Sequence, residues 1–388
     1  MNHKSHIAVM AALVTAFASV GVARAVTDEE FNALKLKVLD LESKAGVSEE
    51  ATAKNNFVMA GGVDVNYQKT QGENGGFLLG SFNPIFLLRS GDKVLFEGAL
   101  EFNVQNQDNG ASSVETVVEF AQVSYLVNDW LTLTAGKIVL PLGSFIETTD
   151  PAWINKLPTF PLPRADQTAI LPESDIGVQA HGGISLGGGS YINYGAFVVN
   201  GPGHTSSTDT NGVTTETLSF DSVENQNNSL GFGGKLGCFT PLAESSSFEI
   251  GVSGESGKWD SQGQNNWSVL VCDARLHVTP AAEIRGEYIH SSEDTATGTL
   301  TPKGWWIQGA YQLSGLDTDV ALLNKLELVA RYAQVDLDQG DGAIKQTALG
   351  VDYHITGTLA LKGDYEINSA DNPDAAKNTV NLQIAYGF

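Results

Sequence analysis

The stretch Thr379–Phe388 (TVNLQIAYGF) ends the chain and alternates large apolar residues with small or polar ones. A period of two places successive side chains on opposite faces of a β-strand, here one apolar face and one small or polar face. A strand of about ten residues with one apolar face can cross a bilayer as part of a β-barrel. The last strand of a soluble β-sandwich has the same alternation, so the rest of the chain has to decide between the two folds.

The first 25 residues have the composition of a cleavable export signal. Lys4 lies in a short basic head, the run from Ile7 to Val20 is apolar and uncharged, and Ala23-Arg24-Ala25 forms a small-x-small cleavage site. The apolar run is shorter than the roughly 20 residues that a spanning helix needs. We therefore expect a signal peptide over residues 1–25 and a mature chain that is exported. An aromatic residue at the C-terminus, here Phe388, is typical of barrels in the outer membrane of Gram-negative cells, which is the location we predict.

Composition and charge restrict the choice of partners. The chain has 388 residues, with 42 Gly, 3 Met and 2 Cys, and a net charge of −23 that becomes −25 once Lys4 and Arg24 leave with the signal. A nucleic-acid partner requires a basic surface, so we expect none. Acidic residues gather in two loop-like segments, 317–319 and 336–341. These segments keep the loops hydrated or, alternatively, bridge to lipopolysaccharide through divalent cations.

Residues 26–55 predict a short periplasmic coiled-coil and linker segment. Apolar residues recur there at alternating steps of three and four, as in a heptad seam. Two to three heptads do not hold a coiled coil alone, but they suffice where the barrels already associate. We expect a homotrimer whose three-stranded seam contains Phe31, Leu34, Val38 and Leu41. The alternatives are a frayed amphipathic helix or a plug in the lumen.

Residues 56–388 predict an all-β fold, a 16-stranded antiparallel transmembrane β-barrel. Links after even-numbered strands are mostly short and those after odd-numbered strands are longer and polar, as in bacterial barrels with short periplasmic turns. The links 239–246 and 313–324 are longer than this rule expects. Sixteen strands enclose a water-filled channel. The sixteen strand candidates are 57–68, 77–88, 93–105, 114–127, 130–138, 175–185, 190–199, 229–238, 247–256, 266–278, 281–290, 304–312, 325–335, 345–353, 358–367 and 379–388.

The two cysteines, Cys238 and Cys272, fall on candidate strands that a third strand separates. Strands that are next but one lie about 9–10 Å apart, which is too far for a disulfide without movement of the backbone. We therefore interpret both as small apolar residues, with Cys272 on the lipid face. A disulfide is the alternative.

The third outer loop, 139–174, carries a family resemblance. It begins with the segment Lys137-x-x-x-Pro141-x-Gly143 and continues through Trp153 to a proline-rich stretch that ends at Arg164. This region resembles the third loop of porins in the phosphate-selective-porin-like superfamily, including members with a periplasmic N-terminal coiled coil. The resemblance implies a loop that folds into the barrel and narrows it. The chain departs from the phosphate-selective members because it is acidic and has no dense ladder of Lys and Arg. An external lid that never enters the lumen is the alternative.

Charged residues on or beside this loop predict a constriction of mixed charge. Opposed charges there would create a transverse field that favours polar over apolar solutes. Three arginines on inward strand phases would add a basic wall, although Glu283 and Glu287 share a face with one of them, an arrangement in which part of the charge pairs off. The predicted constriction has Lys137, Lys156 and Arg164 facing Glu147, Asp150, Asp166 and Glu173, and the predicted wall has Arg275, Arg285 and Arg331.

Signals for catalysis are weak. The segment Gly183–Gly187 matches G-x-S-x-G, but it falls in a strand and a glycine turn instead of the strand–turn–helix that a nucleophile elbow needs. The histidines of the mature chain are scattered without metal-ligand spacing, so we expect no metal and no cofactor. The sequence favours a passive porin for small hydrophilic solutes and ions over the two alternatives, a barrel-embedded hydrolase and an outer-membrane receptor or adhesin.

Overall fold

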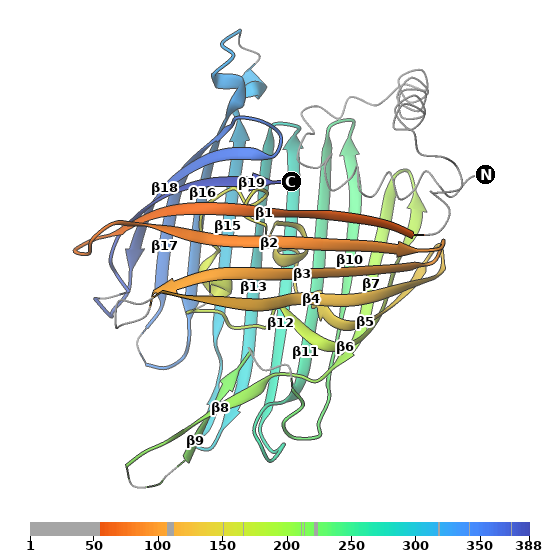
Figure 1. Cartoon of the computed structure of the whole chain (residues 1–388), viewed down its shortest axis with the longest axis vertical. Helices are drawn as coiled ribbons and strands as arrows, with labels where there is room; N and C mark the ends of the chain where they lie inside the picture. Colours follow the sequence, from red (N-terminus) through yellow and green to blue (C-terminus); the bar gives the residue numbers. More distant parts are fainter. Residues whose placement is uncertain are drawn as a thin grey trace.

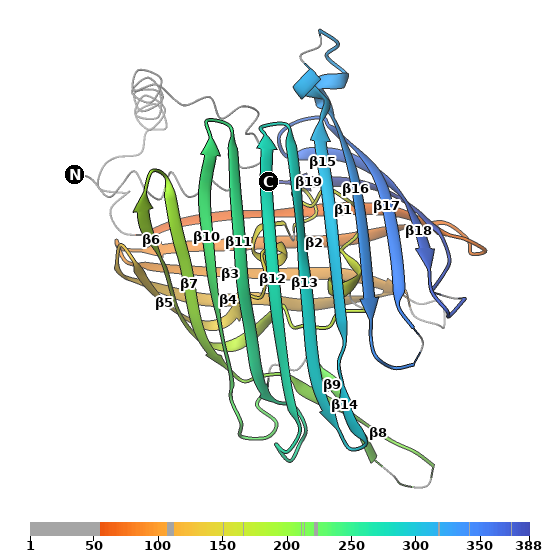
Figure 2. The same cartoon turned by 180° about the vertical axis from the view of Figure 1, so that it is seen from behind.

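The computed structural model describes residues 55–106, 112–149, 151–165, 167–210, 212, 214–220, 224–316, 319–340, 342–373 and 375–388. Within these ranges, sixteen long antiparallel strands form one closed barrel (Figures 1 and 2). The first and last strands close it, with pairs that run from Gly62–Gly387 to Thr70–Thr379. The predicted signal peptide and trimer seam lie outside the described residues.

The strands differ in length but follow the chain in order around the ring. β14 (Gly298–Leu300) is a short piece that pairs with β13 ahead of β15, and β8 (Gly203–Thr208) and β9 (Thr214–Ser219) form a separate hairpin. The barrel strands are β1 (Asn55–Thr70), β2 (Gly76–Ser90), β3 (Val94–Asn106), β4 (Ser112–Asn128), β5 (Leu131–Val139), β6 (Ser174–Gly187), β7 (Ser190–Val199), β10 (Gly231–Ala243), β11 (Ser246–Lys258), β12 (Asn266–Thr279), β13 (Ala282–Thr295), β15 (Lys303–Gln312), β16 (Leu326–Asp336), β17 (Ile344–His354), β18 (Leu359–Ser369) and β19 (Thr379–Gly387).

All sixteen predicted strands are confirmed. Of the two links that were predicted to be unusually long, 239–246 and 313–324, one is confirmed and one is not. The prediction of a long link over 239–246 is wrong, because β10 continues to Ala243 and β11 begins at Ser246, which leaves a tight turn. The other predicted long link, 313–324, is long in the structure as well: it runs over 313–325 and contains the 3₁₀ helices η2 (Leu313–Leu316) and η3 (Leu323–Lys325). This link projects from one end of the barrel in Figure 1, and the β8–β9 hairpin projects from the other.

The alternation along β19 sorts side chains between the lumen and the outer surface. Its inward positions are buried, as in Asn381 and Gln383, at 4% and 5% exposure. Its outward positions, together with Phe388 directly after the strand, are exposed and carry apolar or aromatic side chains: Val380, Leu382, Ile384, Tyr386 and Phe388. The backbone of Phe388 exchanges two hydrogen bonds with Gly61 of β1, at 3.1 and 3.0 Å, so the terminal aromatic residue lies at the closure of the ring. The apolar outward side chains suit contact with lipid, and the closed ring of strands pairs the backbone polar groups, as a structure that spans a bilayer requires.

Both cysteines are free, as predicted. Cys238 is on β10 and Cys272 is exposed on β12, and β11 separates the two strands. Among the described residues, no helix is long and apolar enough to cross a membrane.

The segment 117–137, whose alternation is poor, contains irregular pairing. The register of β3 and β4 shifts between Ala99 and Leu100, so Glu119 is an extra residue in β4. Gly136 has φ +134°, and a Cβ there would lie 2.1 Å from the carbonyl oxygen of Ala121. A β-bulge such as the one at Glu119 bends the strand and redirects its side chains, which is why a strict period of two fails here. After the shift, Val117 and Glu119 both line the lumen, while Val118 faces outward.

Val117 and Val118 offer a matched test of the two faces of the barrel. Val118→Arg should destabilise the barrel by about 2–4 kcal/mol, because it places a charge in the hydrocarbon near mid-strand. Val117→Arg should cost far less, because its side chain stays in the wet lumen. The measurement is the free energy of unfolding in urea, with the barrel in lipid vesicles. Equal losses for the two variants would show that the assignment of faces is wrong.

Candidate functional site: the lumen and its third loop

Loop 3, the link between β5 and β6 (140–173), lies inside the barrel on an apolar patch of the wall. It contains a short helix, α3 (Phe145–Thr149), and a 3₁₀ turn, η1 (Leu162–Arg164). Its apolar side chains pack in one buried cluster with wall residues of β7, β12, β13, β15 and β16: Leu140, Leu142, Phe145, Leu162, Ile170 and Leu171 against Phe197, Val199, Trp267, Val269, Val271, Ile289, Trp306, Ala333 and Val335. The ring of Phe145 lies 5.5 Å from that of Trp306. The expectation that this loop enters the barrel is confirmed, and the external lid is excluded.

A buried carboxylate, Glu287 on β13, joins both halves of loop 3 to the wall. Its Oε1 accepts hydrogen bonds from the backbone N–H groups of Ser144 and Phe145, at 2.8 and 2.9 Å. Its Oε2 accepts from Arg164 Nε at 2.7 Å and from Trp306 Nε1 at 3.1 Å. The first two donors are at the start of α3, where N–H groups have no partner within the helix. The side chains of Arg164 and Glu287 are 1% and 0% exposed, so their charges compensate each other away from water.

Gly143 of the Lys-x-x-x-Pro-x-Gly segment fits the space beside this ion pair. Its φ is +80°, a conformation that favours glycine. A Cβ at this position would lie 2.5 Å from Glu287 Oε1 and 2.6 Å from Arg164 Nη2. Arg164 Nη2 also donates to the carbonyl oxygen of Leu142 at 2.6 Å. The glycine is therefore required by both the turn and the close approach of the two charged groups.

The predicted basic wall faces inward, but loop 3 covers most of it. Arg285, 3% exposed, donates to Thr149 Oγ1 at 3.1 Å and lies against the rings of Phe145 and Trp306. Arg331, 2% exposed, donates to the backbone carbonyl and the hydroxyl of Thr159, at 2.7 and 2.8 Å. These two guanidinium groups hold loop 3. Arg275 remains partly exposed and pairs with Glu283 at 3.2 Å.

Three lysines make further contacts between loop 3 and the wall. Lys362 of β18 donates to the carbonyl oxygens of Ala152 and Asn155. Lys156 of loop 3 pairs with Glu327 of β16. Lys235 of β10 pairs with Glu147 of α3 and donates to the carbonyl oxygen of Gly143 at 3.0 Å.

One trio among the described residues has ligand atoms close enough to hold a metal ion: Glu327, Asp352 and His354, with these atoms within 4.8 Å of one another. Lys156 already pairs with Oε1 of Glu327, and Nε2 of His354 lies 3.2 Å from Oε2 of the same carboxylate. A cation in this trio would compete with the lysine for the same carboxylate. The contacts present therefore fit an anchor for loop 3 better than a metal centre.

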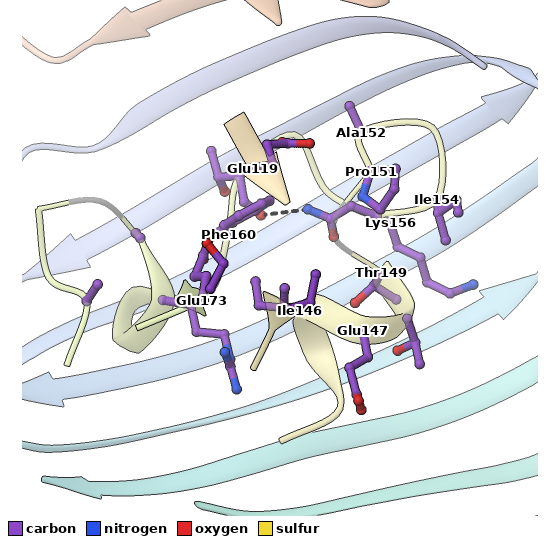
Figure 3. A pocket seen from close by; sticks show the side chains of 18 of the residues that line it. Glu119, Ile146, Glu147, Thr149, Pro151, Ala152, Ile154, Lys156, Phe160 and Glu173 are labelled. Atoms are coloured by element: carbon purple, nitrogen blue, oxygen red, sulfur yellow. Dashed lines mark hydrogen bonds between the residues drawn. The ribbon is translucent and has the colours of Figure 1, made fainter. Parts of the chain in front are cut away.

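The space that loop 3 leaves open is a cavity of about 2690 Å³, lined by strands β1–β5, the inner face of loop 3 and the mouths of the barrel. Figure 3 shows Ile146, Thr149 and Phe160 of loop 3 around this cavity, together with Glu119 and Glu173. Thr205, Leu218 and Phe220, in or next to the β8–β9 hairpin, line it as well, and Phe220 packs on Trp267 with ring centroids 5.5 Å apart. The link after β7 therefore reaches the lumen in addition to loop 3.

The predicted constriction residues divide into two groups. Lys156, Arg164 and Glu147 line the cavity, but each forms an ion pair with a wall residue. Lys137 and Glu173 lie at the two ends of loop 3 and also line the cavity. Asp150 and Asp166 lie outside the described residues. The structure thus brings five of the seven to the lumen, and places three of them against the wall instead of against one another.

Sequence reasoning missed the partners of loop 3. Lys362 and Glu287 fall on the inward phases of their strands, so the alternation alone assigns them to the lumen. No signal in the sequence says which inward residue meets loop 3, because these contacts join positions as far apart as Asn155 and Lys362. The role of Glu327 and Lys235 likewise depends on where the loop lies in three dimensions.

The Gly183–Gly187 match to the nucleophile elbow lies at the end of β6, where Gly187 has φ +86° in a tight hairpin. Its serine is not at a strand–turn–helix junction, so this match has a conformational explanation without catalysis.

Comparison with known proteins gives one distant relative in sequence. The chain is 26% identical over 304 residues to an uncharacterized protein of Aquifex aeolicus, a match that covers 71% of this chain and 66% of the other. The chain thus spans just under two thirds of that relative's length. No family model matches the sequence.

Solved structures share the fold. An anion-selective porin from Comamonas acidovorans has a TM-score of 0.57 at 12% identity, covering 86% of this chain and 100% of the other. The trimer form of OmpT, an outer membrane protein of Vibrio cholerae, gives 0.54 at 11%, covering 86% and 100%. The outer membrane channel DcaP of Acinetobacter baumannii gives 0.54 at 14%, covering 88% and 99%. The chain therefore has a porin-like, 16-stranded outer-membrane β-barrel fold.

The contacts of Glu287 predict that its loss loosens loop 3. Glu287→Gln should cost about 3–5 kcal/mol, because it leaves the guanidinium of Arg164 buried without a counter-charge. Once loop 3 is loosened, the single-channel conductance should rise and the open-channel current should become noisier. Glu249→Gln is the matched control, since it makes the same substitution at a residue of β11 that also lines the cavity. If the two variants have the same conductance and noise, Glu287 does not hold the loop.

Proposed function

We propose that the protein is a passive, water-filled channel that carries small hydrophilic solutes and ions across the outer membrane of a Gram-negative cell. The observation that supports this most is the cavity of about 2690 Å³ inside a barrel with an apolar outer belt, because sixteen Asp, Glu, Lys and Arg residues line this cavity together with uncharged polar and apolar ones. A channel of this kind performs no chemistry. Its selectivity comes from width and from the charges at its narrowest part.

The position of loop 3 supports a fixed constriction. The loop is attached through an apolar cluster and through ion pairs or hydrogen bonds to β10, β13, β16 and β18. Several of these attachments would have to break together for the loop to leave the lumen. We therefore place the narrowest part of the channel between loop 3 and strands β1–β5. The lipid and lipopolysaccharide of the membrane are the partners of the outer surface.

We also propose that the native protein is a homotrimer, with Phe31, Leu34, Val38 and Leu41 in a periplasmic seam. The heptad spacing supports it, and the matched OmpT structure is described as a trimer form. Light scattering in mild detergent, with and without residues 26–53, tests the seam. The shortened chain should dissociate more readily while its barrel stays folded, and a monomeric native protein would contradict the proposal.

Reconstituted protein tests the channel itself. Vesicles that contain it should swell in solutions of small uncharged sugars, at rates that fall as the sugar grows, because a passive pore sorts such solutes by size. Replacing residues 144–171 with a short Gly/Ser linker should remove most of this dependence on size. Vesicles that do not swell, and planar bilayers without discrete current steps, would contradict the proposal.

A further inference from the structure

The wall that holds loop 3 and the opposite wall, strands β1–β5, differ in their balance of positive and negative charge. Among the described residues, twelve Asp or Glu side chains line the open cavity, compared with four Lys or Arg side chains. Ion pairs join Lys156 to Glu327, Arg164 to Glu287 at 2.7 Å, and Arg275 to Glu283 at 3.2 Å. The remaining cation, Lys137, is on β5, and its Nζ donates to the carbonyl oxygen of Val118 at 2.6 Å. The positive charge on the side of loop 3 is therefore largely balanced.

The opposite wall, strands β1–β5, carries a ladder of carboxylates. Glu97 and Glu101 are on β3, and Glu115 and Glu119 are on β4. All four line the cavity, and Glu173 joins them from the end of loop 3. Lys137 is the one Lys or Arg in the described part of this wall that lines the cavity.

The pairing of β3 with β4 brings these carboxylates close together. Glu101 lies opposite Val117, and Asn103 lies opposite Glu115, so Glu101 and Glu115 are diagonal neighbours. Diagonal neighbours on one face of a sheet are about 7–8 Å apart, and like charges at such positions repel. Neutral amides solvate two members of the ladder, since Asn83 Nδ2 donates to Glu119 at 2.8 Å and Gln122 Nε2 donates to Glu97 at 3.1 Å. Neutral donors leave the net negative charge of the ladder unchanged.

We propose that the channel prefers cations, and that Glu101, Glu115 and Glu119 determine this preference. The proposal rests on the proposed function and names its solute class, inorganic and small organic cations. Mobile cations next to the ladder reduce the repulsion among the carboxylates, and anions increase it. The spacing of the ladder is shorter than the Debye length of about 8–10 Å at physiological salt, so its charges act together on a passing ion. Walls of one sign of charge concentrate counter-ions in a narrow cleft.

The test is the reversal potential of the full-length protein in a planar bilayer under a tenfold gradient of KCl. The wild-type protein should be more permeable to K⁺ than to Cl⁻. The triple variant Glu101→Gln, Glu115→Gln and Glu119→Gln keeps the size of the side chains and removes three charges, so the permeability ratio should fall to about one. Lys137→Gln should shift the ratio the other way, toward K⁺. The preference of the wild-type protein should weaken as the salt concentration rises, because salt screens the ladder.

A matched control removes the same number of charges from the outer loops: Glu73→Gln, Asp338→Asn and Asp371→Asn, all exposed. Its ratio should stay near that of the wild type. A wild-type preference for Cl⁻, or equal shifts in the ladder variant and the loop variant, would overturn the proposal while leaving the channel function intact. Absence of any current in the wild-type protein would instead contradict the proposed function.

Discussion

The carboxylate of Glu287 accepts four hydrogen bonds inside the barrel, and the place of loop 3 depends on it. A buried carboxylate is costly unless its charge and its lone pairs are compensated. Here the start of α3, the guanidinium of Arg164 and the indole of Trp306 supply that compensation together. Two of these groups are 19 residues apart in loop 3, so one wall residue fixes both the descent of the loop into the lumen and its return.

Fixing the loop on one wall divides the lumen into a packed half and an open half. The packed half covers Arg285, Arg331 and Lys362, which donate to carbonyl and hydroxyl groups of the loop and no longer face water. The open half retains the carboxylates of β3 and β4. A chain that carries cations on its inward faces can thus leave mainly negative charge along the path of ions, because most of the positive charge is used to hold the loop.

The sequence predicts the barrel well because the alternation that marks each strand can be recognised within a short segment of the chain. The alternation in 379–388 assigns each side chain to lipid or lumen without knowledge of the rest of the fold, and the sixteen strands follow from the same pattern and from link length. The prediction for 239–246 is wrong because β10 and β11 extend beyond their clear alternation. The partners of Lys156 and Arg164 could not be predicted, because these partners, Glu327 and Glu287, are on wall strands more than 100 residues further along the chain. The alternation shows that the side chain of a strand residue faces the lumen, where it can contact loop 3. It does not show which residue of the loop it contacts.

The path of ions can be located directly by thiol accessibility in planar bilayers, in a background where Cys238 and Cys272 are replaced by alanine. A cysteine at Asn103, on the open wall, should react with a charged methanethiosulfonate reagent and reduce the current. A cysteine at Gln308 or Gln346, on the wall that loop 3 covers, should leave the current unchanged, since these side chains are 3% and 7% exposed. A fall in current at Gln308 or Gln346 as large as that at Asn103 would show that loop 3 does not close this half of the lumen.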